Sequence, residues 1–255
     1  MSVYFIGIDI GSTSTKVAVY DPNLSKFCDL FFMPTGFSGV EIAKKIYQIL
    51  LEKGYFPFFI TATGYGRVSI EYANLTLTEI LCHGIGANYL FEQDCTVIDV
   101  GGQDTKAIKV VNNKPDDFIM NDKCSAGTGK FIEVMATRLG VDISQIWQIA
   151  TFKENIEISA TCTVFAESEI VSLIAKEVSK EHIAYAIIDS SAKKVASLAK
   201  KFENERYFLS GGLSKVALFV NLLQKELNAK VHTDKNAIFC GAMGASLMGK
   251  RKNES

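Results

Sequence analysis

The chain has 255 residues, 48% of them hydrophobic, which is enough for one large domain or two half-domains with a real core. Its 27 basic and 28 acidic residues balance, so charge gives no reason to expect nucleic acid or an anionic membrane as a partner. No apolar run reaches transmembrane length, and the N-terminus lacks the features of a secretion signal. We therefore expect a cytoplasmic protein.

The predicted elements alternate between strand and helix, which is typical of an α/β fold. In the first part we expect strands at 3–10, 17–19 and 26–33, a helix at 38–53, a strand at 57–62 and a helix at 77–91. Next come strands at 96–100 and 107–110, a turn near 112–115, a return strand at 118–120, and helices at 129–139 and 144–150. The remaining elements are a strand at 156–159, helices at 164–177 and 180–202, a strand at 207–210, a helix at 214–227, a short strand, a glycine-rich last helix and a solvated tail at 250–255.

One motif occurs twice, ninety positions apart: an Asp, a Gly two residues later, then Thr-Lys. The first copy contains Asp9, Gly11 and Lys16; the second contains Asp99 and Gly101 at the same offsets. Such a period indicates duplicated half-domains rather than a solenoid. Glycine lets the turn backbone approach a ligand, hydroxyls and N–H groups can hold phosphate oxygens, and a strand-end Asp can hold Mg²⁺. Two such copies would grip a polyphosphate from both sides.

Other glycine-rich turns fit less well. In dinucleotide-binding fingerprints and in P-loops, the glycine-rich turn is followed by a helix. Here Gly11 and the pair Gly101 and Gly102 are followed by predicted strands instead. The simplest alternative is two ordinary β-hairpins with polar turns. A third glycine signal, Gly211 and Gly212 with Lys215 nearby, lies between a strand and a helix, where an adenosine-binding turn is expected.

Two of the six cysteines precede predicted helices: Cys124 and Cys162. A helix N-terminus lowers the pKa of a thiol, and thiolate is the form that binds metals. Two cysteines cannot complete a four-ligand zinc or iron–sulfur site, but two from each of two subunits can. Buried free cysteines, or a cysteine nucleophile, are the alternatives. Disulfides are not expected in the cytoplasm.

The chain resembles the activators (component A) of 2-hydroxyacyl-CoA dehydratases, iron–sulfur ATPases of the BadF/BadG/BcrA/BcrD type, with the ATP-binding subunits of benzoyl-CoA reductase as relatives. The resemblance runs almost end to end, through residues 6–13, 62–67, 97–104, 121–130, 162–169 and 241–245. Its most specific part is the pair of cysteine segments, which other actin-like ATPases and sugar kinases lack.

The resemblance implies an actin-like fold of two ribonuclease-H-like lobes with ATP or ADP between them, residues 1–92 with about 241–255 forming one lobe and 93–240 the other. It also implies a homodimer that holds one [4Fe–4S] cluster through Cys124 and Cys162 of each chain. ATP binding and hydrolysis would drive one electron, supplied by a ferredoxin or flavodoxin, to a dehydratase or a related CoA-thioester reductase. An exposed cluster would be oxygen-labile, which points to anaerobic growth.

On these positions we assign roles. Asp9 and Asp99 are expected to hold Mg²⁺ through water, and Gln103 or Asp104 to orient the attacking water, because phosphoryl transfer needs positioning more than a strong base. Residues 127–130 would couple nucleotide to cluster, and the 211–215 turn would bind adenosine. The full set expected at the nucleotide is Gly11, Ser12, Thr13, Ser14, Thr15, Lys16, Gly101, Gly102, Gln103, Asp104, Gly127, Thr128, Gly129, Lys130, Gly211, Gly212 and Lys215.

A second hypothesis is an actin-like small-molecule kinase or ATPase without a cluster, which would use the same phosphate turns but need neither Cys124 nor Cys162. The other thiols are expected to be core residues, and Cys82 and His83 to serve packing.

Overall fold

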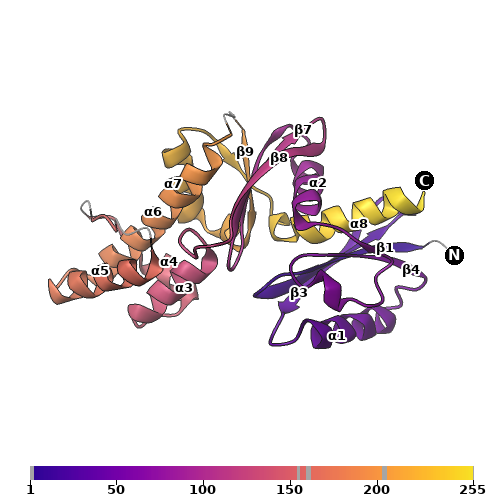
Figure 1. Ribbon diagram of the computed structural model, residues 1–255, viewed down its shortest axis with the longest axis horizontal. Helices are drawn as coiled ribbons and strands as arrows, with labels where there is room; N and C mark the ends of the chain where they lie inside the picture. The colour runs from indigo at the N-terminus through magenta and orange to yellow at the C-terminus, as the bar shows by residue number, and fades with distance from the viewer. Residues whose placement is uncertain (1–2, 154–155, 159–161, 203–205, 255) are drawn as a thin grey trace. The chain divides into compact units, whose positions relative to one another are not determined.

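The computed structural model describes residues 3–153, 156–158, 162–202 and 206–254. Two five-stranded sheets form the framework, with strand orders β3-β2-β1-β4-β5 and β10-β9-β6-β7-β8 (Figure 1). Contacts divide the chain into one compact unit of Met1–Val97, Ile108–Phe118 and Asp234–Ser255, and another of Ile98–Ala107 and Ile119–Thr233. The expected lobe boundaries at 92 and 240 remain a prediction.

The first sheet consists of β1 (Tyr4–Ile10), β2 (Ser14–Asp21), β3 (Lys26–Pro34), β4 (Phe58–Thr63) and β5 (Leu75–Thr76). The first three strands form an antiparallel meander, and β4 and β5 then add in parallel. Asp9 pairs with Lys16 in the β1–β2 register. This pairing places both residues on the same face of the sheet, next to the glycine turn.

Helices cover both faces of this sheet. On one face lies α1 (Gly39–Glu52), which begins where Ser38 accepts a hydrogen bond from the N–H of Glu41 and which buries Ile42, Ile46 and Leu50. On the other lies α8 (Cys240–Asn253), which contacts β1, β2 and β4 and packs against α2 (Glu79–Phe91) (Figure 1). The sheet is therefore the central layer of a three-layer unit.

Glycines permit the close approach of α8. A Cβ on Gly7 of β1 would overlap the carbonyl oxygen of Ala242, and one on Gly244 would overlap the carbonyl oxygen of Cys82 in α2. Backbone therefore packs directly against backbone where α8 crosses β1 and where it crosses α2.

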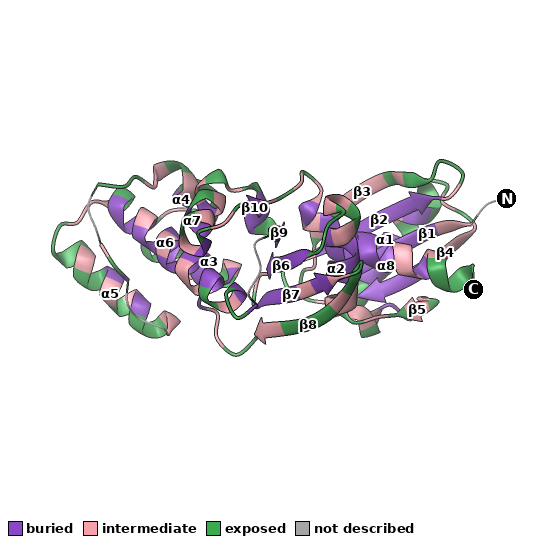
Figure 2. Ribbon diagram, turned by 90° about the horizontal axis from the view of Figure 1, so that it is seen from above, coloured by how far each residue is buried: buried purple, intermediate pink, exposed green. Residues whose placement is uncertain are grey.

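The second sheet consists of β6 (Cys95–Val100), β7 (Thr105–Val111), β8 (Lys114–Asn121), β9 (Tyr207–Gly211) and β10 (Val231–His232). Its strand order repeats that of the first sheet, with β6 in the place of β1 and β9 in the place of β4. The buried centre and more exposed edge strand β8 are visible in Figure 2. The repeated sequence motif thus corresponds to a repeated sheet topology.

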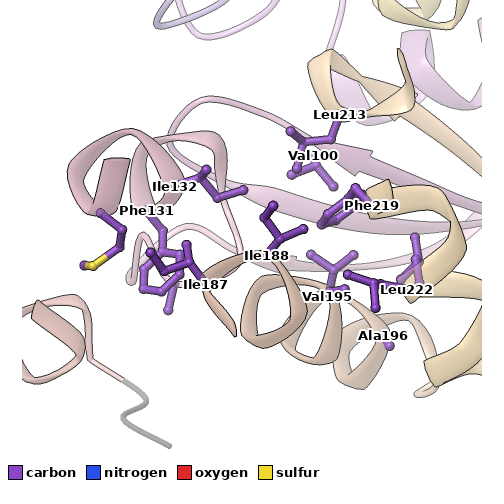
Figure 3. Packing of buried hydrophobic residues seen from close by; sticks show 14 of the residues in the cluster. Val100, Phe131, Ile132, Ile187, Ile188, Val195, Ala196, Leu213, Phe219 and Leu222 are labelled. Carbon is purple, nitrogen blue, oxygen red and sulfur yellow. The ribbon is translucent and has the colours of Figure 1, made fainter. Parts of the chain in front are cut away.

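The helices of the second unit are α3 (Gly129–Arg138), α4 (Ile143–Ile149), α5 (Thr163–Ala175), α6 (Lys180–Ala199) and α7 (Ala217–Leu227). Buried residues of α3, α6 and α7 form one core with the sheet, including Phe131, Ile188, Val195 and Phe219 (Figure 3). Cys124 packs against this core. Short 3₁₀ helices occur at Arg67–Ser69, Gly212–Lys215 and Ala237–Phe239.

Most predicted elements are confirmed to within a few residues, but two details are wrong. Residues 156–158 form no strand, and residue 159 lies outside the described residues. The helix expected from 214 begins as the 3₁₀ turn Gly212–Lys215, and α7 starts only at Ala217. The tail expected to be solvated at 250–255 is exposed over residues 251–254, and it continues α8 to Asn253.

Candidate functional site

The first glycine turn joins β1 to β2 and is anchored by a neighbouring hydroxyl. Thr35 Oγ1 donates to the carbonyl of Gly11 at 2.7 Å and lies 2.9 Å from Thr15 Oγ1. Ser12 and Thr13 at the tip are exposed. The base of the turn is therefore held firmly while the hydroxyls of its tip are accessible, as a phosphate turn requires.

Asp9, the first predicted Mg²⁺ residue, is 4% exposed at the end of β1. Two glycines approach its carboxylate: a Cβ on Gly64 would lie 2.5 Å from Oδ1, and a Cβ on Gly241 would lie 2.7 Å from Oδ2. His83 Nε2 lies 3.8 Å from the same Oδ2. His83 is buried, in line with the packing role expected for it. The sequence did not predict that it lies beside Asp9.

The second turn joins β6 to β7, and its carboxylates belong to a buried charge cluster. Lys106 Nζ lies 2.5 Å from Asp104 Oδ2 and 3.5 Å from Asp99 Oδ2. Ser210 Oγ donates to Asp99 Oδ1 at 2.7 Å. Each charged residue is at most 5% exposed. Because a buried charge without a counter-charge is costly, these contacts hold both carboxylates in fixed positions.

The two candidates for orienting water have different surroundings. Asp104 is buried against Lys106, whereas Gln103 is exposed at the tip of the turn. A residue that orients a water needs a polar group directed at solvent or substrate. This contrast favours Gln103.

The third glycine turn follows β9. Gly211 has a φ of +83°, and a Cβ there would overlap the carbonyl oxygen of Val100. Ser214 Oγ donates to the carbonyl of Gly211 at 2.7 Å. Gly212 and Lys215 are exposed, and no heavy atom lies within 4 Å of a Cβ built on Gly212. The turn therefore presents open backbone, as expected of a surface on which a nucleoside lies.

The loop before α3 and the first residues of that helix are hydrogen-bonded to the second glycine turn. The N–H groups of Gly129 and Lys130 donate to the carbonyls of Gly101 (3.0 Å) and Gly102 (2.8 Å). Thr105 Oγ1 donates to the carbonyl of Gly127 at 2.8 Å. The buried hydroxyl of Thr128 donates within the loop, to the carbonyl of Ser125. These contacts support the coupling role expected for 127–130 more than direct contact of those N–H groups with phosphate.

The same loop carries Cys124, and it meets the segment that carries Cys162. Ser125 Oγ lies 2.7 Å from Thr163 Oγ1, so the residues that follow the two cysteines are in direct contact. Cys162 is the N-cap residue of α5, and both thiols belong to partly exposed residues. Asn121 Nδ2 donates to the carbonyl of Cys124 at 2.9 Å. The two segments that the sequence singled out therefore converge.

The other cysteines differ from this pair. Burial raises the pKa of Cys82 and of Cys95 to about 12, and Cys240 is also buried. These three fit the core role expected for them, or the packing role in the case of Cys82. Cys28 is exposed on β3, so its expected place in the core is wrong.

Within the described residues, no group of three or more His, Cys, Asp or Glu side chains is placed to hold a metal ion. In the same described part of the chain, no helix has the length and apolarity to cross a membrane.

The two sheets of matching strand order define the class of this protein's fold, which is actin-like. A sugar kinase of the ROK family, the glucokinase from Streptomyces griseus in complex with glucose and AMPPNP, aligns with a TM-score of 0.61 over 97% of this chain and 99% of its own. At 15% identity this similarity concerns the fold alone. The expected α/β fold with an actin-like architecture is confirmed.

The chain belongs to the BadF/BadG/BcrA/BcrD ATPase family, whose model matches residues 6–249. It is 38% identical to the (R)-2-hydroxyglutaryl-CoA dehydratase activating ATPase of Acidaminococcus fermentans, over 99% of each chain. The structure of component A from that organism aligns over 100% of both chains, with a TM-score of 0.92 and 35% identity. The ADPNP-bound activator of 2-hydroxyisocaproyl-CoA dehydratase from Clostridium difficile aligns over 99% of this chain and 97% of its own, with a TM-score of 0.89 and 32% identity. The family resemblance inferred from the motifs is thereby confirmed.

Proposed function

We propose that this protein is an ATP-dependent one-electron donor that activates a 2-hydroxyacyl-CoA dehydratase or a related CoA-thioester reductase. One observation carries the proposal: the loop that bears Cys124 is hydrogen-bonded through Gly129 and Lys130 to the second phosphate turn. A change at the phosphates therefore has a short backbone path to a thiol. Full-length similarity to activating ATPases supports the same function.

The nucleotide part of the proposal uses residues at three turns. The exposed hydroxyls at the tip of the first turn, together with Lys16, would contact phosphate oxygens, and the 211–215 turn would bind the adenosine. Asp9 and Asp99 would hold Mg²⁺ through its water shell, which suits a small cation that keeps several waters. Gln103 would orient the attacking water.

The cysteine part fits a [4Fe–4S] cluster shared by a homodimer. Cys124 and Cys162 lie on adjoining segments, both are partly exposed, and one of them caps a helix. When bound by two such chains, the cluster would supply one low-potential electron. The N-terminus of α5 would favour added negative charge there, since the positive end of the helix dipole lies at Cys162.

Partner and setting follow from the same proposal. A ferredoxin or flavodoxin would supply the electron, and the dehydratase or reductase component would receive it. The relatives activate different dehydratases. One of them is the activator of lactoyl-CoA dehydratase of Anaerotignum propionicum. The protein would work in the cytoplasm of cells growing without oxygen, because a cluster near the surface is oxygen-labile.

An actin-like kinase or ATPase without a cluster is the alternative, favoured by the fold shared with ROK-family glucokinase. The deciding experiment is measurement of iron and acid-labile sulfide in protein purified without oxygen. The proposal expects about four of each per dimer, lost to a chelator when ATP is present. Absence of iron after anaerobic reconstitution would reject electron transfer and lead to a screen for kinase activity.

Single substitutions sharpen this experiment. Cys124→Ser and Cys162→Ser should each lose iron while they retain nucleotide binding. Cys28→Ser is the matched control, because that thiol is exposed but lies on β3 in the first unit, and it should keep the full iron content. Equal iron loss in all three variants would contradict the ligand assignment.

A further inference from the structure

A cavity of about 410 Å³ opens beside Cys124 in the second unit. Its lining contains two lysines and no carboxylate: Thr105, Ile119, Met120, Asn121, Cys124, Ala126, Gly127, Lys194, Val195, Ser197, Leu198 and Lys201. The cavity thus joins Cys124, the loop that couples it to the phosphate turn, and one side of α6. Neither the phosphate turns nor the cysteine pair assigns a role to the lysines.

Lys194 is held in place within this lining. A Cβ on Gly127 would lie 3.3 Å from Lys194 Cβ, so α6 packs directly against the loop that carries Cys124. The Lys194 ammonium lies 5.2 Å from the ring centroid of Phe131, which is fully buried on α3. A cation over an aromatic face is stabilised by the ring quadrupole, so the ammonium has a defined position. The adjacent residue Val195 lies in the core (Figure 3).

Lys194 and Cys124 line the same cavity. Burial lowers the pKa of the Lys194 ammonium, while the nearby groups of Cys124, Glu169 and Cys162 raise it. The surroundings of this lysine therefore include both cysteines. Lys201 lines the same cavity seven residues further along the chain.

We propose that Lys194 is a positioning residue for electron transfer, whose fixed positive charge raises the reduction potential of the cluster bound by Cys124 and Cys162. This inference rests on the proposed function. One-electron reduction makes the cluster and its four thiolates one unit more negative, with the electron coming from a ferredoxin- or flavodoxin-class donor. A nearby ammonium stabilises that added charge, and one such lysine is contributed by each chain.

The test is the midpoint potential of the anaerobically reconstituted dimer, measured by dithionite titration with electron paramagnetic resonance detection. Lys194→Met should lower the potential, whereas Lys194→Arg, which keeps the charge, should retain it. Lys201→Met is the matched control, since it removes the same charge from the same cavity, and it should shift the potential much less. A purely structural role for Lys194 would not separate Met from Arg in this way.

Each outcome is decisive. An unchanged potential in Lys194→Met at wild-type iron content would overturn the inference and leave the proposed function intact. Loss of iron in Lys194→Met but not in Lys194→Arg would support a role for the charge. Loss of iron in both variants would assign the effect to packing and overturn the inference. Absence of iron from the wild-type dimer would overturn the proposed function together with the inference.

Discussion

The two glycine turns share a backbone design but differ in how their polar residues are used. In both, the N–H of the glycine donates to the carbonyl three residues later: Gly11 to Ser14 at 3.2 Å, and Gly101 to Asp104 at 2.9 Å. The first turn has a hydroxyl where the second has a carboxylate. The equivalent lysines, Lys16 and Lys106, accordingly have different surroundings.

Lys16 is partly exposed, and among the described residues no carboxylate forms an ion pair with it. Lys106 is 2% exposed and is paired with Asp104 and Asp99. The second lysine is therefore part of a buried charge cluster, whereas the first lies nearer the surface. The second turn also belongs to a hydrogen-bonded network that continues, through Gly129, to the cysteine loop.

The largest difference between the turns should appear when each lysine is replaced by methionine. Lys106→Met leaves two buried carboxylates without their counter-charge, so we expect the free energy of unfolding to fall by about 3–5 kcal/mol. Lys16→Met should change it by less than about 1 kcal/mol, because that lysine is partly exposed and the change removes no partner of a buried charge. Urea denaturation of both variants checks this. Equal stability of the two variants would show that the turns are equivalent.

A second experiment asks whether the nucleotide and cysteine functions separate. Asp99→Asn keeps the shape of the side chain but removes the charge, so Mg²⁺-dependent nucleotide affinity should fall by about tenfold or more, or about 1.4 kcal/mol. Its iron content should remain that of wild type, and Cys124→Ser should show the reverse. Nucleotide titration and iron analysis on both variants give the result. If both lost the same single property, the assignment of separate sites would be wrong.

The sequence predicted the two hairpins because their signals are local: an apolar run, a glycine, and an apolar run again. It could not separate Lys16 from Lys106, since both occupy the same position of the same motif. Their difference depends on burial and on side chains from other strands, such as Ser210, which is 111 residues from Asp99. The distance between His83 and Asp9 is equally invisible in a single sequence.

The strand expected at 156–159 shows how a local pattern misleads. Ile156, Glu157 and Ile158 alternate as a strand would, but the buried Ile158 packs into the helical core instead. Its carbonyl accepts a hydrogen bond from Ser190 Oγ of α6 at 3.2 Å. A side-chain donor on a helix thus replaces the strand neighbour that the alternation implied.

Removal of one buried hydroxyl from each turn should have a smaller effect. Thr105→Val breaks the hydrogen bond to Gly127, and Thr15→Val breaks the contact with Thr35, so each should cost about 1 kcal/mol of stability. Only Thr105→Val should also weaken coupling, because only that hydroxyl bonds to the cysteine loop. The measurement is the rate at which a chelator removes iron with and without ATP. A wild-type response to ATP in Thr105→Val would exclude this hydroxyl from the coupling path.

The smallest effect on stability, and the sharpest on chemistry, is expected for Gln103→Ala. The side chain is exposed, so unfolding should change by less than about 0.5 kcal/mol. The rate constant of ATP hydrolysis should fall by about tenfold or more, corresponding to about 1.4 kcal/mol of barrier, while ATP affinity stays constant. Asp104→Asn is the comparison variant, and it should lose stability first because it breaks the contact with Lys106. If Asp104→Asn instead stopped ATP hydrolysis without loss of stability, while Gln103→Ala hydrolysed ATP at the wild-type rate, the Asp104 carboxylate would be the group that orients water. One side chain of the second turn would then have both a structural and a catalytic role.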